Sequence, residues 1–158
     1  MELYLAGPDV FRPDVREWAQ SARALCEGRG HRALLPVDKV LADPAEIYRH
    51  NVALIREADA LLANLAPFRG AEPDSGTAFE VGFALALGKR VIGYVERGEL
   101  LRERVARSQA GVLRQDAAGW LDAQGWRVED FGLPLNLMLA VPIELVTGGL
   151  EAALQRLD

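Results

Sequence analysis

Cysteine and histidine are scarce in this chain of 158 residues. Cys26 stands alone, which excludes a disulfide framework and a cysteine-rich metal site. His31 and His50 are the only histidines, and neither has a partner at the spacing of metal ligands. We therefore expect no metal site, and nothing in the sequence supports a catalytic triad through either histidine.

Long apolar runs, a secretory start and an excess of positive charge are also lacking. No stretch reaches the about 20 apolar residues of a membrane span, and the N-terminus lacks the features of a signal peptide. The net charge is −5, with arginines scattered among acids, which argues against a nucleic-acid polymer as the main partner. We expect a cytoplasmic protein that binds no membrane.

Glycine-rich phosphate loops are absent too. No Gly-x-Gly-x-x-Gly follows the first apolar run, and there is no Walker-type loop, so a dinucleotide or triphosphate ligand is unsupported. No cofactor is implied.

The chain does contain apolar runs that alternate with helical patterns, as in an α/β protein. We predict strands at 2–7, 32–37, 58–65 and 90–95, with a short fifth strand within 126–132. We predict helices at 13–27, 43–57, 77–87 and 144–157, with one or two more within 99–126. This alternation predicts one domain over residues 1–158, built on a parallel sheet with helices on both faces.

The segment "PDSGTAFEVGFALALGKRVIGY" raises the question of what Glu80 does. Thr77 and Glu80 have the spacing of a capping box, which the helix dipole would favour. The alternative is chemistry, because ligands of parallel sheets bind beyond the carboxyl ends of the strands. There Tyr4, Asp74 and Glu80 are expected to converge on one crevice.

Two carboxylates and a tyrosine without a metal suit nucleophilic catalysis at a sugar carbon. Glu80 would attack, kept ionised by the helix N-terminus. Tyr4 would orient it by a hydrogen bond, and Asp74 would hold sugar hydroxyls. The alternative for Asp74 is a turn or N-cap residue.

Four segments then resemble the nucleoside 2-deoxyribosyltransferases: "YLAGPDVFRP", "ADALLANLAPFRG", "PDSGTAFEVGFALALGK" and "FGLPLNLML". They stand in the family's order and spread from residue 4 to residue 139. The resemblance implies a flavodoxin-like (Rossmann-like) five-stranded parallel sheet and a ping-pong exchange of nucleobases. It places the family's nucleophile on Glu80, its orienting tyrosine on Tyr4 and its sugar-binding aspartate on Asp74.

The resemblance also implies substrate contacts and a homo-oligomer. Gly7 and Phe11 belong to the first loop, where the aromatic ring would lie against the base. Asn136 and Met138 match residues that reach into a neighbouring subunit's site. If the resemblance is set aside, the sequence favours a core-packing role for Met138 and a turn role for Asn136.

The sequence departs from part of the family at Asn51, where some members have an aspartate that handles the nucleobase. An amide can hydrogen-bond a base edge, but it cannot supply a proton as a carboxylic acid can. Protonation of the leaving base would then need water, the base itself or another residue such as Asp38.

The leading hypothesis is therefore transfer of deoxyribose from a 2′-deoxynucleoside to a free nucleobase, without cofactor or metal. The alternative within the superfamily is a 2′-deoxynucleoside 5′-monophosphate N-glycosidase. The loop "GPDVFRP" disfavours it, because it offers one glycine, one cation (Arg12) and the acidic Asp9. A third hypothesis is a nucleoside-binding module without catalysis.

Overall fold

A five-stranded parallel sheet forms the centre of the computed structural model, which describes residues 1–109 and 111–157. The strand order is β2-β1-β3-β4-β8, and all four neighbouring pairs are parallel. The α/β prediction is thus confirmed. The strands are β1 (Glu2–Ala6), β2 (Arg32–Leu34), β3 (Ala60–Asn64), β4 (Arg90–Val95) and β8 (Glu144–Thr147).

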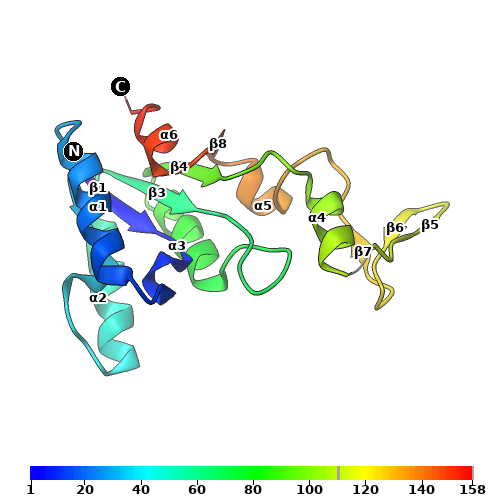
Figure 1. The fold of residues 1–158 in the computed structure, drawn as a ribbon, viewed down its shortest axis with the longest axis horizontal. Coiled ribbons are helices and arrows are strands. Elements are labelled where there is room, and N and C mark those ends of the chain that lie inside the picture. Colours follow the sequence, from blue (N-terminus) through cyan, green and yellow to red (C-terminus); the bar gives the residue numbers. More distant parts are fainter. Residues whose placement is uncertain (110, 158) are drawn as a thin grey trace.

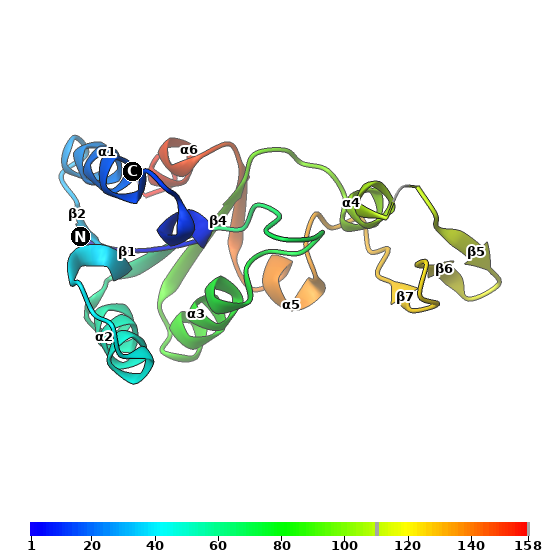
Figure 2. The ribbon, with the colours of Figure 1, turned by 60° about the horizontal axis from the view of Figure 1, so that its bottom comes forward.

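Helices cover both faces of this sheet (Figures 1 and 2). Helices α1 (Val15–Glu27) and α6 (Leu150–Leu154) pack on one face. Helices α2 (Pro44–Glu57), α3 (Ser75–Ala86) and the short α5 (Leu137–Ala140) pack on the other. Two 3-10 turns, η1 (Pro8–Phe11) and η2 (Pro36–Asp38), follow β1 and β2.

Alternation along the strands divides the core into two layers. Leu3 and Leu5 of β1 face the α1 side, while Tyr4 and Ala6 face the α3 side, because successive strand residues point to opposite faces. Strand β3 is apolar on both sides and almost fully buried, as a central parallel strand must be.

Two helices begin at aspartate caps. The Asp43 side chain accepts a hydrogen bond from the Glu46 amide (2.9 Å) ahead of Pro44, which confirms the predicted start of α2. Asp74 accepts one from the Thr77 amide (2.9 Å), so α3 begins at Ser75.

The predicted helix over 144–157 is wrong in its first third. Residues 144–147 form β8, which pairs with β4 from Ile92 to Val95, and only Leu150–Leu154 are helical. Val146 and Thr147 are β-branched and suit a strand, and the pairing with β4 outweighs the helical spacing of the leucines. Gly148, with φ of 128°, then separates strand from helix.

Residues 99–131 form what we call the arm, which extends away from the parallel sheet (Figures 1 and 2). Helix α4 (Leu101–Ser108) leads into a small antiparallel sheet of β5 (Arg114–Asp116), β6 (Gly119–Leu121) and β7 (Arg127–Val128). The fifth strand expected within 126–132 is therefore β7 of this second sheet. Of the one or two helices expected within 99–126, the described residues form one, α4. Among the described residues, no helix has the length and apolarity to cross a membrane.

Candidate active site

A cavity of about 650 Å³ lies at the carboxyl edge of the sheet, where the loops after β1, β2 and β3 meet. Five residues singled out from the sequence line it: Gly7, Phe11, Asn51, Asp74 and Glu80. Helix α1, residues 36–37 and residues 39–41 add apolar side chains and the cations Arg16, Arg23 and Lys39 to the wall. The expected convergence on one crevice is observed for Asp74 and Glu80, whereas Tyr4 is absent from the lining and reaches the cavity only through its bond to Glu80.

Tyr4 and Glu80 form a direct pair between strand β1 and the cavity. The Tyr4 hydroxyl donates to Glu80 Oε1 over 2.6 Å. Tyr4 is fully buried in β1, so its ring cannot turn away, and burial together with the glutamate charge raises its pKa. The hydroxyl stays protonated and remains a donor. Among the described residues, Glu80 Oε2 accepts no hydrogen bond and is left free on the cavity side.

Glu80 does not cap its helix. Because α3 begins at Ser75, Glu80 lies in the second turn, and Thr77 bonds to Asp74 instead. The capping-box interpretation of Thr77 and Glu80 is therefore wrong. Burial raises the Glu80 pKa to about 7; the Tyr4 hydrogen bond opposes this rise and the Asp74 charge adds to it. The ionising effect expected from the helix N-terminus is outweighed by desolvation.

Asp74 serves as N-cap and also lines the cavity. Its Oδ2 accepts hydrogen bonds from the Thr77 amide (2.9 Å) and hydroxyl (3.0 Å). The described residues donate nothing to Oδ1, which is left for a ligand. The cap holds this carboxylate still, so the N-cap and sugar-binding interpretations are compatible.

The wall at Phe11 is braced by two residues that the sequence analysis quoted but did not assign. The Phe11 and Phe68 rings stack at 5.3 Å between centroids, and the Arg69 guanidinium lies over both, at 5.2 and 4.6 Å. Arg69 has φ of 55°, unusual for a residue with a side chain. The segment "APFRG" could have indicated Phe68 and Arg69 as residues of the cavity wall, because this aromatic–arginine pair follows a strand at the edge of the sheet where ligands bind.

Asn51 and Asp38 differ in their access to the cavity. The Asn51 Oδ1 is buried and accepts no hydrogen bond from any described residue, while the side chain lines the cavity. Asp38 is absent from the lining; it pairs with Arg23 and accepts from the Leu35 amide (3.1 Å). Asn51 therefore offers the cavity a side chain with an unpartnered oxygen, and Asp38 is engaged elsewhere.

Asn136 and Met138 lie outside the cavity of their own chain. Asn136 caps α5 through the Met138 amide (3.0 Å) and donates to Glu129 Oε1 (2.6 Å). Its interpretation as a turn residue is consistent with this role. Met138 is 72% exposed, so the core-packing alternative is wrong.

The first loop closes tightly over the end of β3. Asn64 Nδ2 donates to Asp9 Oδ2 (2.7 Å), and a Cβ at Gly7 would come within 2.7 Å of Asn64 Cβ. A larger residue than glycine would push this loop away from the cavity floor. Within residues 1–109 and 111–157, no cluster of three His, Cys, Asp or Glu side chains could hold a metal ion.

Comparisons with known proteins agree with this geometry. A sequence model of the family described as nucleoside 2-deoxyribosyltransferase matches residues 3–138. A solved 2-desoxiribosyltransferase from Leishmania mexicana is 35% identical, with a TM-score of 0.81, over 98% of this chain and 95% of that one.

Two further structures show the same fold at lower identity. A 2-deoxyribosyltransferase from Bacillus psychrosaccharolyticus is 22% identical over 68% of this chain and 82% of that one, with a TM-score of 0.52. A CMP N-glycosidase from Clostridium botulinum is 16% identical over 100% of this chain and 98% of that one, with a TM-score of 0.53. An uncharacterised Schizosaccharomyces pombe protein is 33% identical over 113 residues, which are 65% of this chain. The match covers 54% of that relative, so the chain spans about half its length.

Proposed function

The chain belongs to the nucleoside 2-deoxyribosyltransferase family, and we propose that it moves the 2-deoxyribosyl group of a 2′-deoxynucleoside to another nucleobase. The observation that carries the proposal is the Tyr4–Glu80 pair on the cavity wall. A carboxylate oriented by a buried hydroxyl, with its second oxygen free, is what an attack on a sugar carbon requires. No cofactor is part of the proposal.

In the first half-reaction, Glu80 Oε2 attacks the anomeric carbon while the bond from that carbon to the base nitrogen breaks. The bonding electrons leave with the base, which takes up a proton. The product is a glutamyl-deoxyribosyl ester. Tyr4 keeps Oε1 engaged, so that Oε2 faces the sugar.

In the second half-reaction, a nitrogen of the incoming base attacks the same carbon and the Glu80 carboxylate leaves. The incoming base loses a proton. Two inversions retain the configuration at the sugar carbon. Water in place of the base would give free deoxyribose.

The remaining cavity residues supply binding. The free Oδ1 of Asp74 is proposed to accept a hydrogen bond from a sugar hydroxyl. Phe11, braced by Phe68, would lie against the base, with Gly7 leaving room on the loop side. Asn51 would hydrogen-bond the base edge without giving it a proton. Because Asp38 is paired with Arg23, water or the base itself is the better candidate for protonation.

A second copy of the chain is the proposed source of Asn136 and Met138. Both lie outside the cavity of their own chain, yet Met138 and nearby Val141 are exposed by 72% and 71%. Apolar side chains this exposed, close together on a short helix, suit burial against another subunit. We therefore propose a homo-oligomer with shared sites.

Incubation with deoxyinosine and adenine tests the function. The expected product is β-deoxyadenosine, formed faster than free deoxyribose, with ping-pong kinetics. Free deoxyribose as the only product at saturating adenine would instead favour the hydrolase. Parallel reactions with deoxynucleoside 5′-monophosphates measure that alternative directly. Binding without any turnover would leave only a nucleoside-binding module.

A further inference from the structure

Arg104 is a buried charge that the proposed chemistry does not use. It lies on α4, at the base of the arm, and is 2% exposed. No carboxylate of the described residues lies within ion-pair distance of it. Burying an unpaired guanidinium is costly unless its N–H groups are hydrogen-bonded.

Its hydrogen bonds go to three backbone carbonyls from three segments. Nη1 donates to Ala71 O and Nη2 to Glu99 O, both at 3.3 Å, and Nη2 also donates to Pro134 O. Ala71 lies three residues before Asp74, and Pro134 lies two residues before Asn136. One planar group therefore ties the loop that leads to Asp74 to the segment that leads to Asn136.

Other hydrogen bonds hold each of these two segments separately, among them the bonds of Asn136 (2.6 Å) and the Leu137 amide (3.0 Å) to Glu129. The amide of Leu101 donates to Leu133 O (2.9 Å), and the amide of Phe68 closes a turn on Glu72 O (2.9 Å). Neither bond joins the two segments to each other. Only Arg104 makes hydrogen bonds to both among the described residues.

We propose that Arg104 is a positioning residue that sets the placement of Asp74 and Asn136 and thereby the selection for the sugar hydroxyls. This inference rests on the proposed function. If Asn136 acts in a second copy, then the same guanidinium links the site of its own chain to that of its neighbour. The selected ligand is a 2′-deoxynucleoside that keeps both its 3′- and its 5′-hydroxyl.

Equilibrium binding to a non-reacting protein gives the test. Glu80→Gln provides that background, and calorimetry measures deoxyinosine against 2′,3′-dideoxyinosine and 2′,5′-dideoxyinosine. With Arg104 present, we expect at least one analogue to bind roughly 10- to 100-fold more weakly than deoxyinosine, since the site is left with an unpaired polar group. Arg104→Met should reduce that preference at least about fivefold, with little change for the analogue.

Two controls separate positioning from general loosening. Arg102→Met removes an arginine of the same helix that pairs with Asp130 in the arm, and it should leave the preference unchanged. In an Asp74→Ala background, Arg104→Met should have no further effect on the preference for a hydroxyl that Asp74 holds. If Arg104→Met fails to unfold cooperatively, Arg104→Lys, which keeps the charge but loses the planar fork, carries the same comparison.

An unchanged hydroxyl preference in the folded Arg104 variant would overturn the inference while leaving the proposed function standing. An equal loss of affinity for all three nucleosides would also overturn it, because that result indicates a structural role alone. Failure of the Arg104-intact protein to bind any of them would overturn the proposed function, and the inference with it.

Discussion

Carboxyl groups beside the parallel sheet and in the arm experience opposite environments. Glu80 is partly buried next to Tyr4, and desolvation raises its pKa to about 7. Asp116, exposed in the arm, accepts two hydrogen bonds from Arg127 (2.6 and 2.8 Å), and its pKa falls to about 2. Desolvation disfavours the charged form, whereas a cationic partner favours it.

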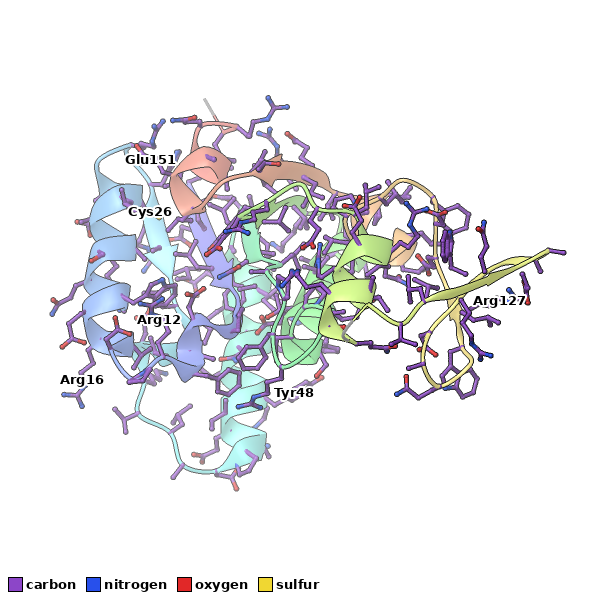
Figure 3. All side chains as sticks on the ribbon, turned by 45° about the vertical axis from the view of Figure 1, so that its right-hand side comes forward. Arg12, Arg16, Cys26, Tyr48, Arg127 and Glu151 are labelled. Atoms are coloured by element: carbon purple, nitrogen blue, oxygen red, sulfur yellow. The ribbon has the colours of Figure 1, made fainter. Side chains whose placement is uncertain are left out.

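The two regions also differ in what holds them together. Beside the sheet, leucines such as Leu62 are fully buried between helices. In the arm, the strands are exposed or partly exposed, and Arg102 pairs with Asp130 and lies over the Trp120 ring at 5.2 Å. Figure 3 shows Arg127 in the arm, far from Cys26 on helix α1. The buried apolar core therefore lies at the sheet, and Arg104 links the arm to the segments that lead to Asp74 and Asn136.

Replacing Glu80 should have the largest effect on base exchange of the substitutions proposed here. Glu80→Gln keeps the size of the side chain but removes the nucleophile, so base exchange should fall on the order of 10⁴-fold or more. The exchange assay measures the loss, with Glu72→Gln, an exposed acid outside the cavity lining, as the control. Near-normal turnover by folded Glu80→Gln protein would rule out the mechanism.

Mixing two inactive variants tests whether Asn136, which follows the arm, contributes to the active site of another subunit. Glu80→Ala and Asn136→Ala oligomers should each be nearly inactive. In a mixed dimer, one site carries both defects and the other carries neither. Random reassortment would therefore leave roughly a quarter of the sites intact.

The exchange assay after mild dissociation and mixing reads the outcome. Labelled subunits must be shown to reassort in the same sample. If they reassort and no activity returns, Asn136 serves its own chain or no site at all.

Substitutions of a large side chain by alanine compare the packing of the sheet region with that of the arm. Leu62→Ala should lower the free energy of unfolding by about 2–5 kcal/mol, because it leaves a void in a rigid core. Trp126→Ala in the arm should change it by less than about 0.5 kcal/mol, since that ring is 74% exposed. Urea denaturation of both variants gives the comparison, and similar losses would mean that the arm is packed by a second copy.

Because ionised Glu80 destabilises the folded chain, Glu80→Gln should increase the free energy of unfolding by an amount that depends on pH. In the unfolded chain Glu80 ionises near 4.5, but in the folded chain only near 7, so its charge destabilises the fold increasingly as the pH rises between these values. Glu80→Gln should raise the free energy of unfolding by about 1–3 kcal/mol at pH 8 and by less than about 1 kcal/mol at pH 5. Denaturant curves at the two pH values measure this. A pH-independent difference would contradict the buried pKa.

Smaller shifts should appear in the pH dependence of kcat/KM. The wild-type value should rise with pH and level off above about 7, as Glu80 ionises. Tyr4→Phe removes a hydrogen bond that lowers the Glu80 pKa, so the rise should move to higher pH. Asp74→Asn keeps the cap but removes a charge that raises it, so the rise should move to lower pH. Shifts in the same direction would contradict these assigned causes.

The site was predictable where its signals were local or followed from topology. Tyr4 lies within a short apolar strand, and Asp74 and Glu80 stand in one block before a buried strand. The rule that ligands bind at the carboxyl edge of parallel strands then brought them together. The cavity lining confirms that convergence for Asp74 and Glu80.

Local signals failed where distant contacts compete with them. The leucine spacing after residue 144 is helical, but pairing with β4 makes residues 144–147 a strand. Thr77 and Glu80 fit a capping box, but Asp74 captures the Thr77 amide and hydroxyl first. In both cases the deciding partner, strand β4 or Asp74, lies outside the local pattern.

By itself, the sequence determined the alternation of strands and helices, the family and the identity of the proposed nucleophile, because these depend on contiguous patterns of apolar and polar residues. Only the tertiary structure decided that Glu80 ionises near pH 7, that Phe68 braces Phe11 and that Arg104 joins two site segments. Each of these depends on burial or on contacts between residues far apart in the chain. Desolvation and hydrogen bonding depend on what surrounds a group in space, and the order of residues along the chain does not specify those surroundings directly.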